Sequence, residues 1–162
     1  MLDLKINTYL KIVFAISLTS IISAYFIEYI LGHQPCNLCL IERIPYGISI
    51  ILITSNLILK INKKFIILLL IITFAFSLII SFYHFGIEQG FFKESAVCGI
   101  KNTSEFISKE ELLKKLQEIT ISCKDVTFRV FGLSLTTLNI ILSLILIIFL
   151  TKIFVNYEKF KN

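Results

Sequence analysis

Charged residues are scarce in this sequence, and tryptophan is absent. Asp, Glu, Lys and Arg make up 17% of the 162 residues, whereas a soluble domain carries about 25%. Hydrophobic residues make up 56%, and the mean hydropathy is +0.86. A soluble fold of this size needs more polar surface than this composition supplies. The composition therefore excludes a single soluble core and indicates a membrane protein.

Charge is also missing from long stretches of the chain. A bilayer core about 30 Å thick needs about 20 apolar residues of helix. Such runs are too long to be buried strands. The first run is also too long for the apolar region of a signal peptide, and no A-x-A-like cleavage site follows it. The sequence therefore predicts four transmembrane helices, at about 12–31, 44–59, 65–83 and 130–151.

Basic residues are distributed unevenly between the two ends of these helices. The termini and the link between the second and third helices carry eight Lys and two acidic residues. The loops at about 32–43 and 84–129, together with Glu28, carry eight basic and nine acidic residues. The positive-inside rule therefore predicts that both termini are cytoplasmic. We interpret the net charge of +5 as a sign of topology rather than of nucleic-acid binding.

No cysteine falls on the predicted cytoplasmic side. Cys36, Cys39, Cys98 and Cys123 all lie outside, where disulfides persist, and their even number allows two pairs. A structural zinc site needs short ligand spacing in both halves, but 24 residues separate the second pair. Haem attachment needs CxxCH, and Leu40 follows Cys39. Two structural disulfides remain an alternative, although a CxxC ring is small and gains little from loop entropy.

The CxxC lies just before or within the start of the second predicted helix, where Pro45 suits the first turn. A helix start and nearby cations stabilise a thiolate, which favours redox exchange. Arg43 follows Cys39 by four residues, so both share one face if the segment is helical. The alternative for Arg43 is an interfacial anchor paired with Glu42.

The long loop has a helix signal of its own. Ser108 to Glu111 form a capping box, and an apolar stripe follows at helical spacing. This pattern predicts a short amphipathic helix at about 109–121, on the outer membrane surface or the bundle end. Whether it docks a substrate or only fills the loop is open at this stage.

Three segments together resemble one family. PCNLCLIER at 35–43, YHFGIE at 83–88 and FGLSLTTLN at 131–139 are similar to segments of the disulfide bond formation protein B (DsbB) family. The order of the segments and the two cysteines between the last two match as well. The resemblance implies a single DsbB-like membrane domain over 1–162. This would be an all-α, four-transmembrane-helix bundle of the bacterial inner membrane, with both termini cytoplasmic and a long periplasmic loop.

The resemblance also implies an activity. DsbB proteins reoxidise a periplasmic, thioredoxin-like dithiol oxidase, DsbA, and pass the electrons to ubiquinone or menaquinone. By resemblance, Cys98 is the sulfur that DsbA attacks, and Cys123 then exchanges with Cys36. Cys39 faces the quinone as a thiolate. The implied redox disulfides are Cys36–Cys39 and Cys98–Cys123, and no metal is implied.

Two more residues receive roles from the resemblance. Arg43 would stabilise the Cys39 thiolate and a quinone oxygen, and His84 would be a second neighbour of the quinone. Without the family, His84 is equally well explained as an interfacial residue beside Tyr83. The absence of tryptophan means that any Trp supporting the site in other members is missing here.

Two other functions stay open on the sequence alone. A vitamin K epoxide reductase-like enzyme also uses a membrane CxxC and a loop cysteine pair, but there we expect the CxxC late in the chain. A non-catalytic membrane scaffold with structural disulfides is the second. Glu28 and Glu88 are read as solvated acids at the interface, with proton transfer as the alternative.

Overall fold

The computed structural model describes residues 2–59, 62–93, 98, 122–124, 128–130 and 132–159. Within these residues the fold is four long helices and one two-stranded antiparallel hairpin. The loop helix expected at 109–121 lies outside the described residues. In chain order the elements are α1 Leu2–Tyr29, α2 Asn37–Leu59, α3 Lys63–Glu88, β1 Arg129–Val130, β2 Leu133–Ser134 and α5 Leu135–Lys159.

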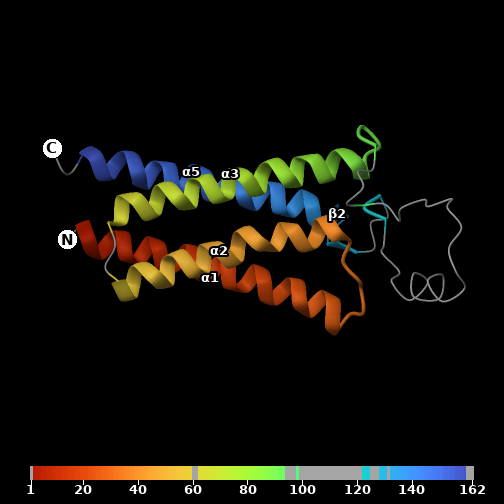
Figure 1. The fold of residues 1–162 in the computed structure, drawn as a ribbon, viewed down its shortest axis with the longest axis horizontal. Coiled ribbons are helices and arrows are strands. Elements are labelled where there is room, and N and C mark those ends of the chain that lie inside the picture. Colours follow the sequence, from red (N-terminus) through yellow and green to blue (C-terminus); the bar gives the residue numbers. More distant parts are fainter. Residues whose placement is uncertain are drawn as a thin grey trace, which may run out of the picture.

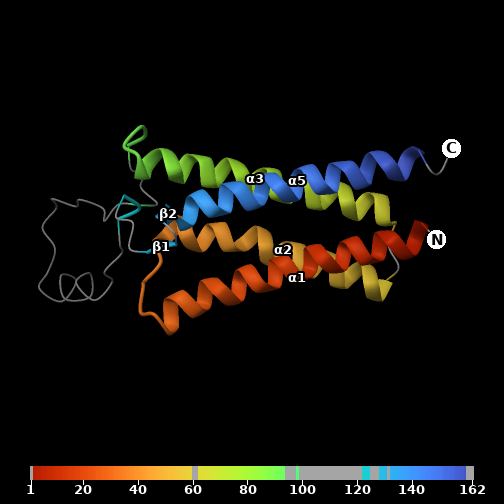
Figure 2. The same ribbon diagram turned by 180° about the vertical axis from the view of Figure 1, so that it is seen from behind.

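The four helices form an up-and-down bundle. Figure 1 places both termini and the α2–α3 connection at one end, and the α1–α2 connection and the hairpin at the other. The reverse view in Figure 2 shows the same arrangement. α3 packs along α5, and α2 packs against both α1 and α3. All four helices are long and apolar enough to cross a membrane, which makes the chain a multi-pass membrane protein.

The helix ends differ from the spans expected from apolar runs. α2 begins at Asn37 rather than near 44, with the backbone N–H of Leu40 donating to the carbonyl of Cys36 at 3.2 Å. Pro45 therefore lies inside the helix and not in its first turn. The apolar-run argument stops at charged residues, but here Glu42 and Arg43 have partners within the bundle and the helix includes them.

The last helix begins later than expected. Residues 129–130 and 133–134 pair as a hairpin, and Gly132 at its turn has φ +84°. Only glycine adopts this left-handed conformation without strain. α5 therefore starts at Leu135 rather than near 130, and the hairpin lies beside its start at the end of the bundle opposite the termini.

The bundle core runs along the inner faces of all four helices. Two serine pairs join helices inside it, Ser49 with Ser17 at 2.7 Å and Ser143 with Ser77 at 3.2 Å. Such small polar residues let membrane helices approach closely. Large apolar side chains are exposed around the outside, as expected for a surface that faces lipid. The fully buried core side chains include Leu10, Val13, Ile53, Ile66, Ile67, Leu70, Phe74, Leu146 and Leu150.

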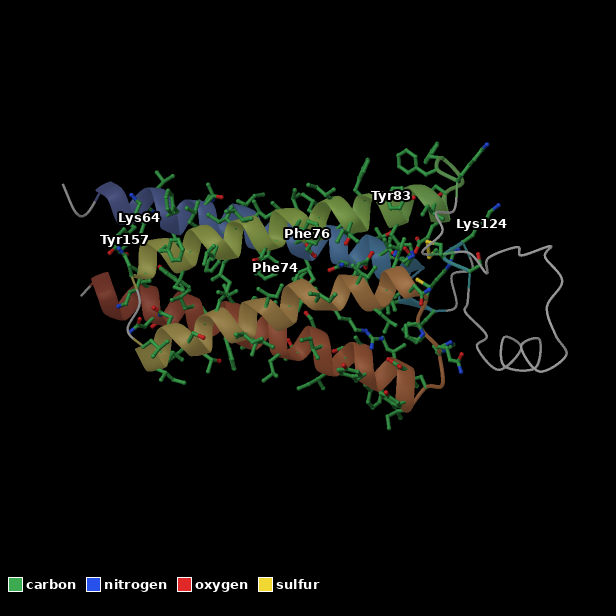
Figure 3. The ribbon with its side chains drawn as sticks, viewed as in Figure 1. Lys64, Phe74, Phe76, Tyr83, Lys124 and Tyr157 are labelled. Atoms are coloured by element: carbon green, nitrogen blue, oxygen red, sulfur yellow. A yellow bond between two sulfur atoms is a disulfide. The ribbon has the colours of Figure 1, made fainter. Side chains whose placement is uncertain are left out.

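A second, smaller buried cluster closes the end of the bundle opposite the termini. Its members are Cys36, Leu38, Ile87, Cys98 and Cys123. In Figure 3, sulfur atoms are drawn at this end, which also carries the labelled Tyr83 and Lys124, while Lys64 and Tyr157 mark the end with the termini. The bundle thus keeps its cysteines together at one end.

Candidate functional site

Cys36 occupies the cap of α2. Its sulfur accepts the backbone N–H of Cys39 at 3.2 Å, the bond that a capping oxygen usually makes at a helix start. Its side chain is 5% exposed. The hydrogen bond from the Cys39 thiol, helped by His84 and opposed by burial, lowers the pKa of Cys36 from 9.0 to about 4. In the reduced protein, Cys36 therefore holds the thiolate at neutral pH.

The two cysteine pairs differ in the geometry of their sulfurs. Cys98 and Cys123 form a disulfide. Cys36 and Cys39 are free thiols whose sulfurs lie 2.7 Å apart. Because Cys36 belongs to the same buried cluster as both cysteines of the disulfide, the two pairs meet at one place.

His84 projects from α3 against Cys36. Its Nε2 lies 3.5 Å from the Cys36 sulfur, and its Nδ1 lies 2.8 Å from Oε1 of Glu42 on α2. The ring is 1% exposed. The hydroxyl of Thr136, near the start of α5, lies 3.2 Å from the same Nδ1. Three helices thus fix the position of this imidazole.

The Glu42 contact also determines which ring nitrogen carries the proton. An ionised carboxylate only accepts, so Nδ1–H must be the donor to Glu42. In the neutral ring, Nε2 then has a free lone pair directed at Cys36. A thiol, a base and a carboxylate that orients the base form the arrangement that activates nucleophiles in other enzymes. His84 can therefore take the proton of Cys36 and stabilise its thiolate.

Glu42 is held in turn by polar side chains inside the bundle. Nδ2 of Asn139 on α5 donates to Oε2 of Glu42 at 3.0 Å and lies 2.7 Å from Oγ of Ser81 on α3. The hydroxyl of Tyr46 donates to Oδ1 of Asn139. One amide thus joins α2, α3 and α5. Buried networks of this kind fix geometry when every member is satisfied.

The acids expected at the interface are not solvated. Glu88 has a side chain that is only 6% exposed, and its Oε1 accepts the Thr136 hydroxyl at 2.6 Å. Its Oε2 is buried with no hydrogen-bond partner among the described residues. Glu28 pairs with Arg43 and is 19% exposed. The sequence-based reading of both as solvated acids was therefore wrong, because their partners come from distant parts of the chain.

Arg43 lies on another face of α2 from Glu42. Its Nη1 lies 2.5 Å from Oε2 of Glu28, and its guanidinium stands 5.0 Å from the centre of the Tyr25 ring. The alternative reading that paired Arg43 with Glu42 is replaced by this pairing with α1. α2 is helical from Asn37, so Cys39 and Arg43 share one face, as the four-residue spacing indicated.

A cleft opens beside the disulfide. It has a volume of about 520 Å³ and lies between the end of α3 and the segment around Cys123. Two basic side chains face it. Its lining residues are Ile87, Gly90, Phe92, Lys93, Ser122 and Lys124. The disulfide therefore lies near open space at the end of the bundle opposite the termini.

Sequence reasoning named the cysteines, Arg43 and His84, and the structure gathers them at one end of the bundle. Its assignment of His84 to a quinone stays a prediction, and within the chain His84 contacts Cys36, Glu42 and Thr136. It missed Glu42, Thr136 and Asn139. These residues could have been found as polar side chains within largely apolar helices, because such residues mark functional positions in membrane proteins.

Comparison with known proteins places the chain in a family. The chain is 33% identical over 142 residues to an uncharacterized protein of Rickettsia prowazekii (strain Madrid E), covering 86% of this chain and 82% of that protein. No solved structure matches. Residues 7–153 match the family described as "Disulfide bond formation protein DsbB". The chain therefore belongs to the DsbB family, and this membership implies a membrane oxidoreductase that forms disulfide bonds.

Proposed function

We propose that this chain is a thiol:quinone oxidoreductase of a bacterial inner membrane. It reoxidises a periplasmic thioredoxin-fold dithiol oxidase of the DsbA kind and passes the electron pair to ubiquinone or menaquinone. The observation that carries the proposal is the buried cluster shared by Cys36 and the Cys98–Cys123 disulfide. Disulfide exchange requires two pairs to meet, because each step is an attack of one sulfur on another.

The exchange begins at the disulfide beside the cleft. A thiolate of the partner attacks Cys98, forms a mixed disulfide and releases Cys123 as a thiolate. Cys123 then attacks Cys36 of an oxidised Cys36–Cys39 pair, and Cys39 leaves as a thiolate. The partner's second thiol attacks its own mixed disulfide, which releases the oxidised partner and the thiol of Cys98.

The chain then returns to its starting state. Cys98 attacks Cys123, which restores their disulfide and releases Cys36. The buried pair of His84 and Glu42 supports this step, since an imidazole 3.5 Å from the leaving sulfur can stabilise its thiolate. Cys36 and Cys39 then close their disulfide as two electrons and two protons leave the protein. A bound quinone supplies the oxidising power for this closure.

The residues around Arg43 fit a quinone. The guanidinium carries a permanent charge and donors suited to a quinone oxygen. It stands against Tyr25, whose ring is 48% exposed, so an aromatic surface and a cation face the lipid together. Cys39 lies one turn away on the same face of α2. We propose that Arg43 and Cys39 hold the quinone head group, and that His84 acts on Cys36.

The orientation in the membrane follows from charge. The end with both termini carries the Lys-rich segments, so we propose that it is cytoplasmic and that the cysteine end is periplasmic. Residues 1–162 then form one domain with its active cysteines outside. This side is the one on which a secreted dithiol oxidase would be available.

The experiment that tests the proposal mixes purified protein, a reduced DsbA-type oxidase and ubiquinone, and follows quinone absorbance. Cys39→Ser should abolish quinone reduction, because no thiolate remains to pass electrons on. Thr54→Ala on the exposed face of α2 is the matched control and should keep the wild-type rate. Full activity in Cys39→Ser would contradict the proposal.

A further inference from the structure

The reduced centre brings together three atoms that bind soft metal ions. Sγ of Cys36, Sγ of Cys39 and Nε2 of His84 all lie within 4.8 Å of one another. Two thiolates and one imidazole are a ligand set that zinc and its heavier relative cadmium prefer. The spacing of the cysteines, with histidines only at 33 and 84, argued against a structural zinc site. Spacing could not show that His84 on α3, 48 residues from Cys36, lies beside it.

The distances are close to those that a tetrahedral ion needs. Such an ion holds a sulfur and a nitrogen about 3.6 Å apart and two sulfurs about 3.8 Å apart. Cys36 and His84 already lie at 3.5 Å, while Cys36 and Cys39 lie at 2.7 Å. The sulfur of Cys39 lies within 4.8 Å of Nε2 of His84, so it would have to move about 1 Å away from Cys36 and also approach the ring to complete the geometry. Cys39 is in the first turn of α2, so this adjustment leaves the helix in place.

His84 is prepared as a ligand by the residue behind it. Its Nδ1 contacts Glu42 at 2.8 Å, which fixes the ring with Nε2 directed at the Cys36 sulfur. Metal-binding histidines in proteins nearly always have such a carboxylate, which orients the ring and raises its basicity. Asn139 holds Glu42 in turn at 3.0 Å. The supporting residues of a metal site are thus already present.

The charges of these buried side chains also suit a divalent cation. The thiolates of Cys36 and Cys39 together match a charge of +2, so the ion would not be left unpaired in the buried site. Oε1 of Glu88 lies 3.9 Å from Nε2 of His84, and its Oε2 has no partner among the described residues. Glu88 is not part of the group of three ligand atoms, so it would act by holding a water in the fourth position.

We propose that the reduced Cys36–Cys39 pair and His84 form a binding site for a thiophilic divalent cation, Zn²⁺ or Cd²⁺. Binding releases the remaining thiol protons, because the ligands must be deprotonated. The bound dithiol cannot form a disulfide, so the ion holds the protein in its reduced state. The oxidised pair has no thiolates and does not bind, which makes the site dependent on the redox state.

The test measures binding of Cd²⁺ alone, in detergent, without quinone or a protein partner. The protein carries Cys98→Ser and Cys123→Ser, so only the proposed thiols remain. After reduction we expect one Cd²⁺ per chain and an ultraviolet thiolate-to-cadmium band. The band should be absent from the oxidised protein and from Cys39→Ser. An equally strong band in either sample would overturn the proposal.

A second measurement needs no further variant. Zn²⁺ added to the same reduced protein should protect Cys36 and Cys39 from alkylation, and a chelator should restore their reactivity. Unchanged alkylation at saturating Zn²⁺ would also overturn the proposal. Neither measurement depends on electron transfer. A negative result would therefore not contradict the proposed oxidoreductase function, and a loss of quinone reduction would not contradict metal binding.

A matched pair of variants tests the role of the carboxylate. Glu42→Gln keeps the shape of the side chain but removes its charge from His84, and should weaken Cd²⁺ binding about tenfold. Glu28→Gln makes the same change at the same end of the bundle, where the carboxylate contacts Arg43 instead. This control should bind Cd²⁺ as the parent does. Equal Cd²⁺ affinities of Glu42→Gln and Glu28→Gln would show that the Glu42 carboxylate does not support metal binding.

Discussion

Cys36 and Cys39 have different environments, although they are one helical turn apart. Cys36 receives a backbone N–H, the thiol of Cys39 and the imidazole of His84. Its thiolate is therefore the better stabilised of the two, and a stabilised thiolate is a good leaving group in exchange. This asymmetry supports the division in which Cys36 exchanges with the loop disulfide and Cys39 faces the acceptor.

The lowered pKa of Cys36 predicts an unusual pH profile. A thiol with a pKa of 9.0 loses reactivity below neutral pH, whereas one with a pKa of about 4 stays a thiolate down to that value. Alkylation of Cys36 in the reduced protein should therefore remain fast between about pH 5 and 8. The lowered pKa stabilises the folded reduced protein fully above pH 9.0, and this contribution declines as the pH falls and is lost below about 4. The measurement is the rate of iodoacetamide labelling at Cys36 against pH.

Replacing His84 tests the cause of this profile. His84→Gln removes a partner that favours the thiolate, so the midpoint of Cys36 labelling should rise by about 1–3 pH units. A merely structural role for His84 would change helicity or yield and leave the midpoint where it is. Ser20→Ala on α1 serves as the control, since its hydroxyl bonds only to the carbonyl of Ile16 at 2.9 Å.

Arg43 is proposed to hold the quinone, and its replacement tests that role. Arg43→Ala removes a charged donor to the proposed quinone oxygen, and the quinone KM should rise about tenfold or more. Glu28→Gln leaves the guanidinium in place and loosens only its ion pair, so a smaller increase is expected. The measurement is a quinone titration at saturating dithiol partner. An unchanged quinone KM in Arg43→Ala would show that Arg43 does not bind the quinone.

At the scale of elements, the end of α3 is shaped by one glycine. The backbone N–H groups of Phe91 and Phe92 both donate to the carbonyl of Gly86, at 2.8 and 3.1 Å. This turn folds the Phe92 ring over Gly86 and stacks it on Tyr83, with ring centres 5.7 Å apart. A side chain at Gly86 would overlap the ring, so the glycine permits a close approach that ends the helix.

This packing predicts opposite results at two glycines. Gly86→Ala should lower the stability of the protein by about 1–3 kcal/mol, because the Phe92 ring must move away. Gly47→Ala in α2 meets nothing within 4 Å and should be neutral or slightly stabilising. Thermal unfolding followed by helicity compares the two. Adding Phe92→Ala to Gly86→Ala should recover part of the loss, and no recovery would count against this explanation.

The number of membrane helices could be predicted from the sequence, but the helix ends and the contacts of the site could not. Long apolar runs with little or no charge predicted four transmembrane helices, and the structure confirms four helices long and apolar enough to cross a membrane. Helix ends were less predictable, since Glu42 and Arg43 looked like the edge of the membrane but lie inside α2. The partners of His84 were not predictable, because Glu42 and Thr136 lie 42 and 52 residues away along the chain. Residue spacing predicts which side chains share a face of one helix, whereas side chains from three helices form this site.

At the scale of the whole molecule, the bundle separates two ends. α3 has 26 residues and spans about 39 Å at about 1.5 Å per residue, enough to cross the membrane. The cysteine cluster lies at one end and both termini at the other (Figures 1 and 2). Only one of these ends can face the oxidising compartment, so the orientation of the bundle decides whether the cysteines can meet a secreted partner.

Charge predicts which end that is, and reporter fusions test it. Alkaline phosphatase, which needs an oxidising compartment to become active, should be active when fused after Gly90 and inactive when fused after Asn162. A fluorescent protein that folds only in the cytoplasm should show the reverse. Replacing Lys63 and Lys64 by Gln should weaken the asymmetry, because these residues lie at the start of α3, at the end that the positive-inside rule predicts to be cytoplasmic. If phosphatase were active at the C-terminus, the cysteines would face the reducing side, and the proposed exchange with a periplasmic dithiol oxidase would be excluded.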